Sequence, residues 1–196
     1  MMNKPEKGSR ESFQITINAP FTLGFGAVAL IAMILAVLTG GGTTAAAFSL
    51  PGEFDLLNPL FYLRLLLYPA GHASWEHFLS NFTLILLIGP LLEEKYGSGT
   101  ILAFSAFTAV LTGIIHIFLS NAALLGASGI VFMMIILTSL VRVKRNTLPL
   151  TFILVAVLFL GGQILEIFQK DRISQLAHIL GGLCGGALGI WWANKK

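Results

Sequence analysis

Long apolar runs separated by short polar connections dominate the hydropathy pattern of this chain. A helix that crosses the hydrocarbon core of a bilayer needs about 20 mostly apolar residues. The expected fold class is all-α, a polytopic membrane protein in which residues 1–19 form an N-terminal segment and residues 20–196 form one six-helix membrane domain. The six predicted spans lie near residues 21–38, 77–92, 99–119, 126–141, 148–168 and 174–192.

Basic residues predict how these helices are oriented. With the N-terminus in the cytoplasm, nine of the 12 Lys and Arg residues fall on the inner side of the membrane and three on the outer side. The short link at residues 141–145 alone holds three of the nine, and cytoplasmic loops carry such an excess. We therefore expect both termini to be cytoplasmic. Cleavage of the first apolar run as a signal peptide is an alternative, but the run is longer than a usual signal core.

The composition indicates that the lipid bilayer is a partner of this chain and argues against nucleic acid as a partner. Charged residues make up 11% of the chain, against about 25% in a typical soluble domain. The pI is near 9.2, yet the basic residues form no run with interleaved aromatics, so we expect no nucleic-acid binding. The single cysteine, Cys184, excludes an internal disulfide and is expected to be a small packing residue.

The connection at residues 40–73 is long for a protein whose other connections are short. It is rich in Leu and Phe but broken by Pro51, Pro59 and Pro69, which makes it too interrupted for a span. We expect short helices lying in the outer membrane interface. Both a role in substrate handling and a role as an amphipathic connector fit this pattern.

Polar residues inside the predicted spans converge at one depth. His77 and Asn81 share one face in the first turns of the second span, and His72 lies just before it. Ser128 lies in the first turn of the fourth span, and His178 lies about one turn into the sixth. All three spans begin on the outer side, and polar groups in a membrane need a partner or a purpose. The pattern predicts a buried polar site, with Gly181, Gly185 and Gly189 forming a small-residue stripe that lets the sixth helix pack closely.

Ser128 and His178 together suit nucleophilic catalysis. Each alone has a structural explanation, because small residues crowd membrane helix interfaces and a lone buried histidine is commonly a hydrogen-bonded core residue. As a pair they supply a nucleophile and its general base, with His77, Asn81 and the Ser128 N–H as donors for an oxyanion. Neither Asp55 nor Asp171 has a spacing that compels contact with His178, so we expect a dyad. His116 has no motif around it and is expected to be structural. The histidines lack the H-E-x-x-H spacing, so we expect no metal and no cofactor.

Three ordered motifs resemble those of the rhomboid family of intramembrane serine proteases. Residues 72–81 resemble its H-x4-H-x3-N motif, residues 126–129 (Gly-Ala-Ser-Gly) match G-x-S-G, and residues 177–185 match A-H-x-x-G-x-x-x-G. The resemblance implies that Ser128 is the nucleophile and His178 the base, with transmembrane proteins as substrates.

Further expectations follow from the same resemblance. It implies a six-helix core with a cavity opening outward and lateral substrate entry near the second and fifth helices. The compact core, and not the resemblance, is the basis on which we expect a bacterial inner-membrane location. Supporting roles are implied for His72, Phe132, Gly126 and Gly181, and Glu93 resembles a family glutamate that ties the inner helix ends together. Phe132 stands where the family often has tyrosine, and Leu63 precedes Arg64 where it often has a Trp-Arg pair.

Two other functions fit parts of the sequence. One is a catalytically silent rhomboid-like protein that binds transmembrane clients, although retention of both Ser128 and His178 argues against it. The other is a small transporter, which would predict an inverted repeat that the chain does not show. The substrate and the oligomeric state stay open.

Overall fold

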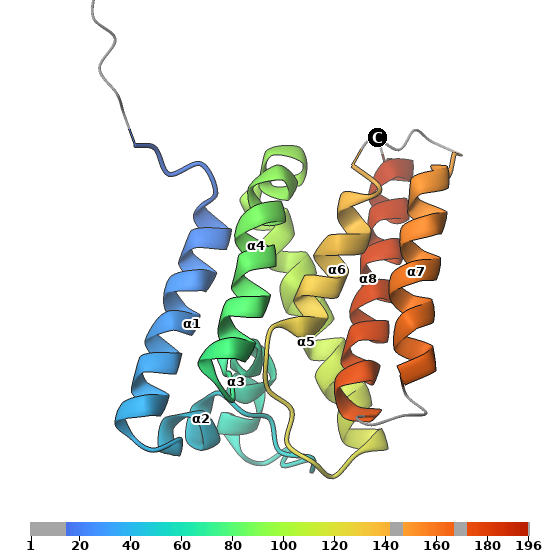
Figure 1. Cartoon of the computed structure of the whole chain (residues 1–196). Coiled ribbons are helices and arrows are strands. Elements are labelled where there is room, and N and C mark those ends of the chain that lie inside the picture. Colours follow the sequence, from blue (N-terminus) through green and yellow to red (C-terminus); the bar gives the residue numbers. More distant parts are fainter. Residues whose placement is uncertain (1–14, 142–146, 167–171, 196) are drawn as a thin grey trace, which may run out of the picture.

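The long helices lie side by side in one bundle (Figure 1). The structure is a computed structural model that describes residues 15–141, 147–166 and 172–195. Its elements are α1 (Pro20–Leu38), α2 (Gly42–Ala47), α3 (Pro59–Leu67), the 3-10 turn η1 (Tyr68–Ala70), α4 (Trp75–Tyr96), α5 (Ser98–Leu119), α6 (Ser128–Thr138), α7 (Leu150–Glu166) and α8 (Arg172–Lys195).

Consecutive long helices run in alternating directions, so α1 begins at the end of the bundle where α8 ends (Figure 1). The helices α4, α6 and α8 all begin at the opposite end, where α2 and α3 also lie. This is the arrangement that the predicted topology requires for His77, Ser128 and His178 to share one depth. Which side of a membrane each end faces remains a prediction.

Each predicted span corresponds to a helix, but the helices differ in length. Within the described residues, four helices are long and apolar enough to cross a membrane: α1, α4, α5 and residues Gln175–Lys195 of α8. The other two, α6 and α7, have 11 and 17 residues. The fourth predicted span, residues 126–141, is longer than α6, because hydropathy alone does not reveal where this helix ends. At that point the hydroxyls of Thr138 and Ser139 bond the carbonyls of Met134 and Ile136 (2.7 and 2.6 Å).

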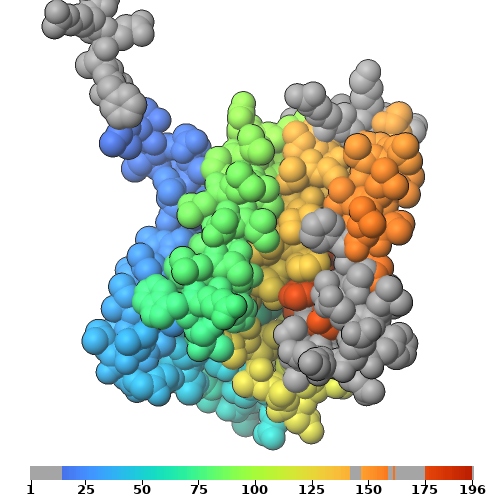
Figure 2. All heavy atoms as spheres, in the orientation of Figure 1, coloured from blue at the N-terminus to red at the C-terminus, as the bar shows by residue number. Residues whose placement is uncertain are grey.

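Apolar side chains cover the outside of the bundle as well as its interior. Large exposed residues on α1, α4 and α7 include Ile31 (57% exposed), Leu87 (67%) and Leu158 (71%). The interior is packed with Ile85, Leu92, Ile101, Met133 and Met134, which are fully buried. Apolar surface on this scale over long helices indicates that lipid, rather than water, surrounds the bundle. On the face of the bundle shown in Figure 2, α6 lies between α4 and α7, and it packs on both helices.

Close packing of α8 on α6 depends on the predicted glycine stripe. A Cβ added at Gly181 would overlap the carbonyl oxygen of Gly129, and one added at Gly185 would overlap that of Met133. The two backbones therefore touch where these glycines lie, as small-residue stripes allow in membrane helices. Cys184 is buried in the same core, as expected for a packing residue.

The long connection contains short helices, as predicted. Arg64 on α3 donates through Nε and one terminal nitrogen to the carbonyl of Ala46 at the end of α2 (2.9 and 2.7 Å). Leu50 and Leu124 exchange two backbone hydrogen bonds (2.9 and 2.8 Å), which join the connection to the segment that leads into α6. The connection is thus a support for the start of α6.

Glu93 near the end of α4 provides the cap that α1 lacks. The N-cap position of α1 is Ala19, which offers no side-chain acceptor. The Glu93 carboxylate accepts from the backbone N–H groups of Phe21 (3.0 Å) and Thr22 (2.7 Å) instead. A carboxylate also favours the positive end of the helix dipole. The expected structural role of Glu93, a tie between helix ends, matches this contact.

Candidate active site

A cavity of about 580 Å³ lies where α4, α6 and α8 begin. The predicted nucleophile, base, oxyanion donors and supporting aromatic all line this cavity. Its wall is formed by Ala73, His77, Ser80, Asn81, Leu84, Ala123, Leu124, Leu125, Ser128, Val131, Phe132, Ala177 and His178. The structure therefore brings together two predicted site residues, His77 and His178, that lie 101 positions apart in the sequence.

Ser128 is the first residue of α6 and is half-buried. The preceding N-cap residue, Ala127, is fully buried and makes no side-chain cap hydrogen bond. The first N–H groups of a helix have no partner inside the helix, and they carry the positive end of its dipole. The Ser128 hydroxyl is thus presented beside backbone donors that can meet a negative charge.

Gly126 shapes the turn into α6. Its φ of +110° lies in the region that favours glycine, and its N–H donates to the carbonyl of Tyr68 (3.0 Å). A Cβ at this position would lie 2.7 Å from Cε1 of His77. The supporting role predicted for Gly126 has a physical basis here, because only glycine lets the turn and the His77 ring approach so closely.

His178 on α8 stacks on Phe132, one turn after Ser128 on α6. The ring centroids are 4.2 Å apart and the planes are inclined by 7°. Stacking fixes the imidazole plane over the start of α6. Gly181, one turn further along α8, lies against Gly129, the residue next to Ser128. The helices that carry Ser128 and His178 are consequently held at backbone contact.

His77 and Asn81 lie one turn apart on α4, and both face the cavity as their spacing predicted. The N-cap of α4 is Ser74, whose hydroxyl accepts from the backbone N–H of His77 (3.1 Å). His77 is half-buried and Asn81 is buried. Both side chains are therefore held at the start of a capped helix.

His72 lies behind this wall, in the loop before α4. It is 2% exposed, and its Nε2 is 3.1 Å from the amide nitrogen of Asn81. Burial lowers the pKa of His72 to about 4, His77 adds to the lowering, and a hydrogen bond to the carbonyl of Ala70 acts in the opposite direction. The ring is thus neutral at neutral pH. The sequence placed His72 near the site but gave no sign of its bond to Asn81.

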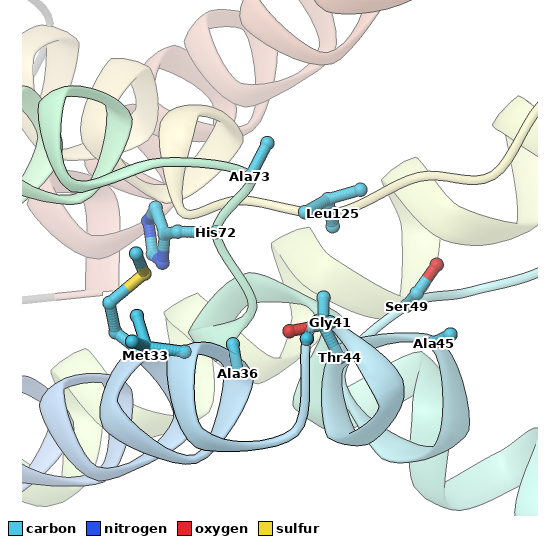
Figure 3. A pocket seen from close by; sticks show the side chains of 11 residues that line it. Met33, Ala36, Gly41, Thr44, Ala45, Ser49, His72, Ala73 and Leu125 are labelled. Carbon is cyan, nitrogen blue, oxygen red and sulfur yellow. The ribbon is translucent and has the colours of Figure 1, made fainter.

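A second cavity of about 530 Å³ adjoins the first on the side of α1 and was not predicted (Figure 3). It is bordered by the end of α1, by α2 and by His72, while Ala73 and Leu125 line both cavities. Figure 3 shows Met33 of α1 beside the His72 ring. Three separate segments form this cavity, so no local sequence pattern could reveal it.

The other candidate groups lie elsewhere. Asp55 accepts from Asn58 within its own loop (2.9 Å), and Asp171 lies outside the described residues. His116 is buried and bonds the carbonyl of Ala122 (2.7 Å), a structural contact. In the part of the chain that the structure describes, no carboxylate lines the cavity, and no three His, Cys, Asp or Glu residues are grouped as metal ligands.

Comparison with known proteins identifies the family. A profile of the Rhomboid domain matches residues 60–195. The chain belongs to the rhomboid family. Its helices from α4 to α8 lie inside the matched segment, whereas α1 and α2 precede it. Family membership and the long apolar helices together indicate that this rhomboid is an integral membrane protein.

One curated relative of this rhomboid comes from a plant. Rhomboid-like protein 11, chloroplastic, from Arabidopsis thaliana is 26% identical over 140 residues. The alignment covers 63% of this chain and 50% of the relative. The chain thus spans about half the length of the curated relative that it matches, and a similarity of this extent supports the family but assigns no substrate.

Proposed function

We propose that this rhomboid is an intramembrane serine endopeptidase with a Ser128/His178 dyad. The observation that carries the proposal is the cavity that both side chains line together with His77 and Asn81. Membership of the rhomboid family supports it, since the three motifs resemble those of the family's proteases. The proposed reaction needs no metal and no cofactor.

In the first half-reaction Ser128 Oγ attacks the carbonyl carbon of the scissile peptide bond while His178 takes the hydroxyl proton. The carbonyl oxygen becomes an oxyanion that accepts hydrogen bonds from the Ser128 N–H, from Asn81 and from His77. When the intermediate collapses, the C–N bond breaks and His178 gives its proton to the leaving amine. An ester between Ser128 and the N-terminal part of the substrate remains.

In the second half-reaction water replaces the amine. His178 takes a proton from a water molecule, which attacks the ester carbonyl through a second oxyanion at the same donors. Collapse returns the proton to Ser128 Oγ and releases a carboxylic acid. The stack of Phe132 on His178 keeps the imidazole in place through both steps.

The short α6 explains how water would reach a site inside the bilayer. At about 1.5 Å per residue, its 11 residues are about 16 Å long, roughly half of a 30 Å hydrocarbon core. With six helices spanning the membrane and both termini in the cytoplasm, Ser128 would lie below the outer surface at the floor of a cavity that opens outward. The proposed location is a bacterial inner membrane.

The proposed substrates are transmembrane segments of other proteins. Substrates would enter laterally between α4 and α7, on the face where α6 lies between these two helices (Figure 2). Ser80 and Leu84 of α4 border the cavity. A helix shields its own carbonyls, so the substrate has to unwind locally before cleavage. Segments with small or helix-weakening residues near the outer surface are the expected class.

A serine-directed probe tests the proposal. Purified protein in detergent should be labelled by a fluorophosphonate and should cleave a transmembrane reporter in liposomes, and Ser128→Ala should abolish both. The matched control is Ser139→Ala, since that hydroxyl bonds its own helix at the other end of α6. Absence of labelling and of cleavage in the folded wild type would overturn the proposal in favour of a client-binding protein.

A further inference from the structure

His72 joins a backbone carbonyl to the amide of Asn81 through a chain of two hydrogen bonds. Its Nδ1 is 3.2 Å from the carbonyl oxygen of Ala70, and its Nε2 is 3.1 Å from Nδ2 of Asn81. Both partners are fixed, because Ala70 belongs to η1 and Asn81 to α4. His72 is therefore the link between a rigid turn and the cavity wall.

The first bond decides the tautomer of His72. A carbonyl oxygen only accepts, so Nδ1 has to carry the proton and donate to Ala70. In a neutral imidazole the other nitrogen, Nε2, is then an acceptor. The tautomer leaves Nε2 with a lone pair directed at Asn81.

The second bond decides the orientation of the Asn81 amide. Only the NH₂ group can donate to Nε2 of His72, and an amide rotated by 180° would place two lone pairs against each other in a buried site. The NH₂ group has two hydrogens, of which His72 takes one. The second stays available as a donor, which is the role that an oxyanion requires of Asn81.

Aromatic contacts hold the His72 ring in this position. The centroids of Phe78 and Phe82 lie 5.5 and 5.7 Å from that of His72, and the ring of His77 lies 4.9 Å away at an angle of 70°. On the opposite side the ring borders the second cavity beside Met33 (Figure 3). The ring is not part of the lining of the catalytic cavity, so a bound substrate would not touch it.

We propose that His72 is a positioning residue that orients the Asn81 amide so that Asn81 donates to the oxyanion. The inference rests on the proposed protease function and adds how one donor of that site is set. His72 acts through Asn81 and has no contact with the reacting atoms.

Two isosteric variants separate the two hydrogen bonds of His72. In His72→Gln the side-chain oxygen reaches the place of Nε2 and still accepts from Asn81. In His72→Asn the amide reaches only the place of Nδ1, so it still donates to Ala70 but leaves Asn81 without its acceptor. Removing an oxyanion donor lowers kcat by about 10²–10³-fold. We expect kcat within about 3-fold of wild type for His72→Gln and about 10–100-fold lower for His72→Asn, with KM unchanged in both.

A double-mutant cycle with Asn81→Ala is the decisive measurement. If His72 acts through Asn81, then His72→Asn should change kcat by less than about 3-fold once Asn81 is already alanine. Equal effects of His72→Asn in the two backgrounds would overturn the inference, as would a lower kcat for His72→Gln than for His72→Asn. Inactive wild-type protein would instead refute the proposed function, so the two failures are distinguishable.

A second buried histidine provides the control for effects that come from loss of folding. His116 also bonds a backbone carbonyl, but it does not line the catalytic cavity. Melting temperatures in detergent are recorded for every variant, and His116→Asn is combined with Asn81→Ala in a parallel cycle. Effects of His116→Asn should be additive with those of Asn81→Ala. A coupling as large as that of His72 would mean that the kcat effects report general destabilisation, which would overturn the inference.

Discussion

Replacing Gly181 with alanine should separate the two helices that carry the proposed dyad. The added Cβ would lie 2.8 Å from the carbonyl carbon of Gly129 and would overlap its oxygen. Non-bonded carbon atoms normally stay about 3.5–4.0 Å apart, so α8 has to move away from α6 by roughly 0.7 Å or more. Ser128 adjoins Gly129, and His178 lies one turn before Gly181, so the same movement separates the hydroxyl from the imidazole.

A misplacement of about 1 Å lowers the rate by up to about 100-fold, or roughly 2.7 kcal/mol of transition-state stabilisation. We expect kcat/KM of Gly181→Ala on a transmembrane reporter to fall by about 10–100-fold, with slower fluorophosphonate labelling of Ser128. Gly186→Ala is the matched control on α8, because the atoms nearest to its added Cβ belong to Phe152 and Ile136 and lie at ordinary distances of 3.6–3.8 Å. A folded Gly181→Ala protein with activity within 3-fold of the control, about the scatter of such assays, would refute the reasoning.

Two further predictions concern Glu93 and the protonation of His72. Glu93→Gln keeps one acceptor for two helix N–H groups, so unfolding in mixed micelles should show a loss of about 1.5–3 kcal/mol that the exposed control Glu94→Gln does not share. Because burial lowers the pKa of His72 from 6.5 to about 4, the unfolded chain binds a proton in this window that the folded chain does not. Thermal stability should therefore fall as the pH drops from 6.5 to 4. The fall should be smaller in His72→Gln, and equal falls in both proteins would contradict the assigned pKa.

Hydropathy predicted the helices better than it predicted their ends. The span predicted at residues 77–92 forms part of a longer helix, from Trp75 to Tyr96. The flanking residues are polar, but they continue the backbone hydrogen bonds of the helix. The apolar run at residues 126–141 concealed the end of α6 at Thr138. A hydroxyl that bonds a carbonyl of its own helix leaves little trace in a hydropathy average, so the short length of α6 was not predictable from apolarity.

The depth of the site in the membrane could be predicted from the sequence, but the contacts between its side chains could not. A polar residue in a span is rare enough to be informative, and the starts of three parallel helices were sufficient to bring Ser128, His178 and His77 to one cavity. The bond between His72 and Asn81 depends on the path of the backbone through the loop before α4, which no periodicity describes. The acceptor for α1 left a weaker signal in the sequence, since Ala19 at its N-cap offers no side-chain acceptor and the distant Glu93 supplies one.

The way in which the helix starts are capped supports placing the oxyanion of the proposed reaction at the start of α6. Ser74 caps α4 with its own hydroxyl, and Glu93 of α4 bonds the first N–H groups of α1. Neither Gly97 at the start of α5 nor Ala127 at the start of α6 supplies a side-chain acceptor, but of these two helix starts it is that of α6 that lies at the cavity wall, where Ser128 follows Ala127. At a capped helix start, some of the first N–H groups already donate to the capping acceptor. In the proposed reaction, the first N–H groups of α6 stay available for the oxyanion, a charge that exists only during the reaction. On this argument, the lack of a capping side chain at Ala127 is part of the catalytic machinery that we propose.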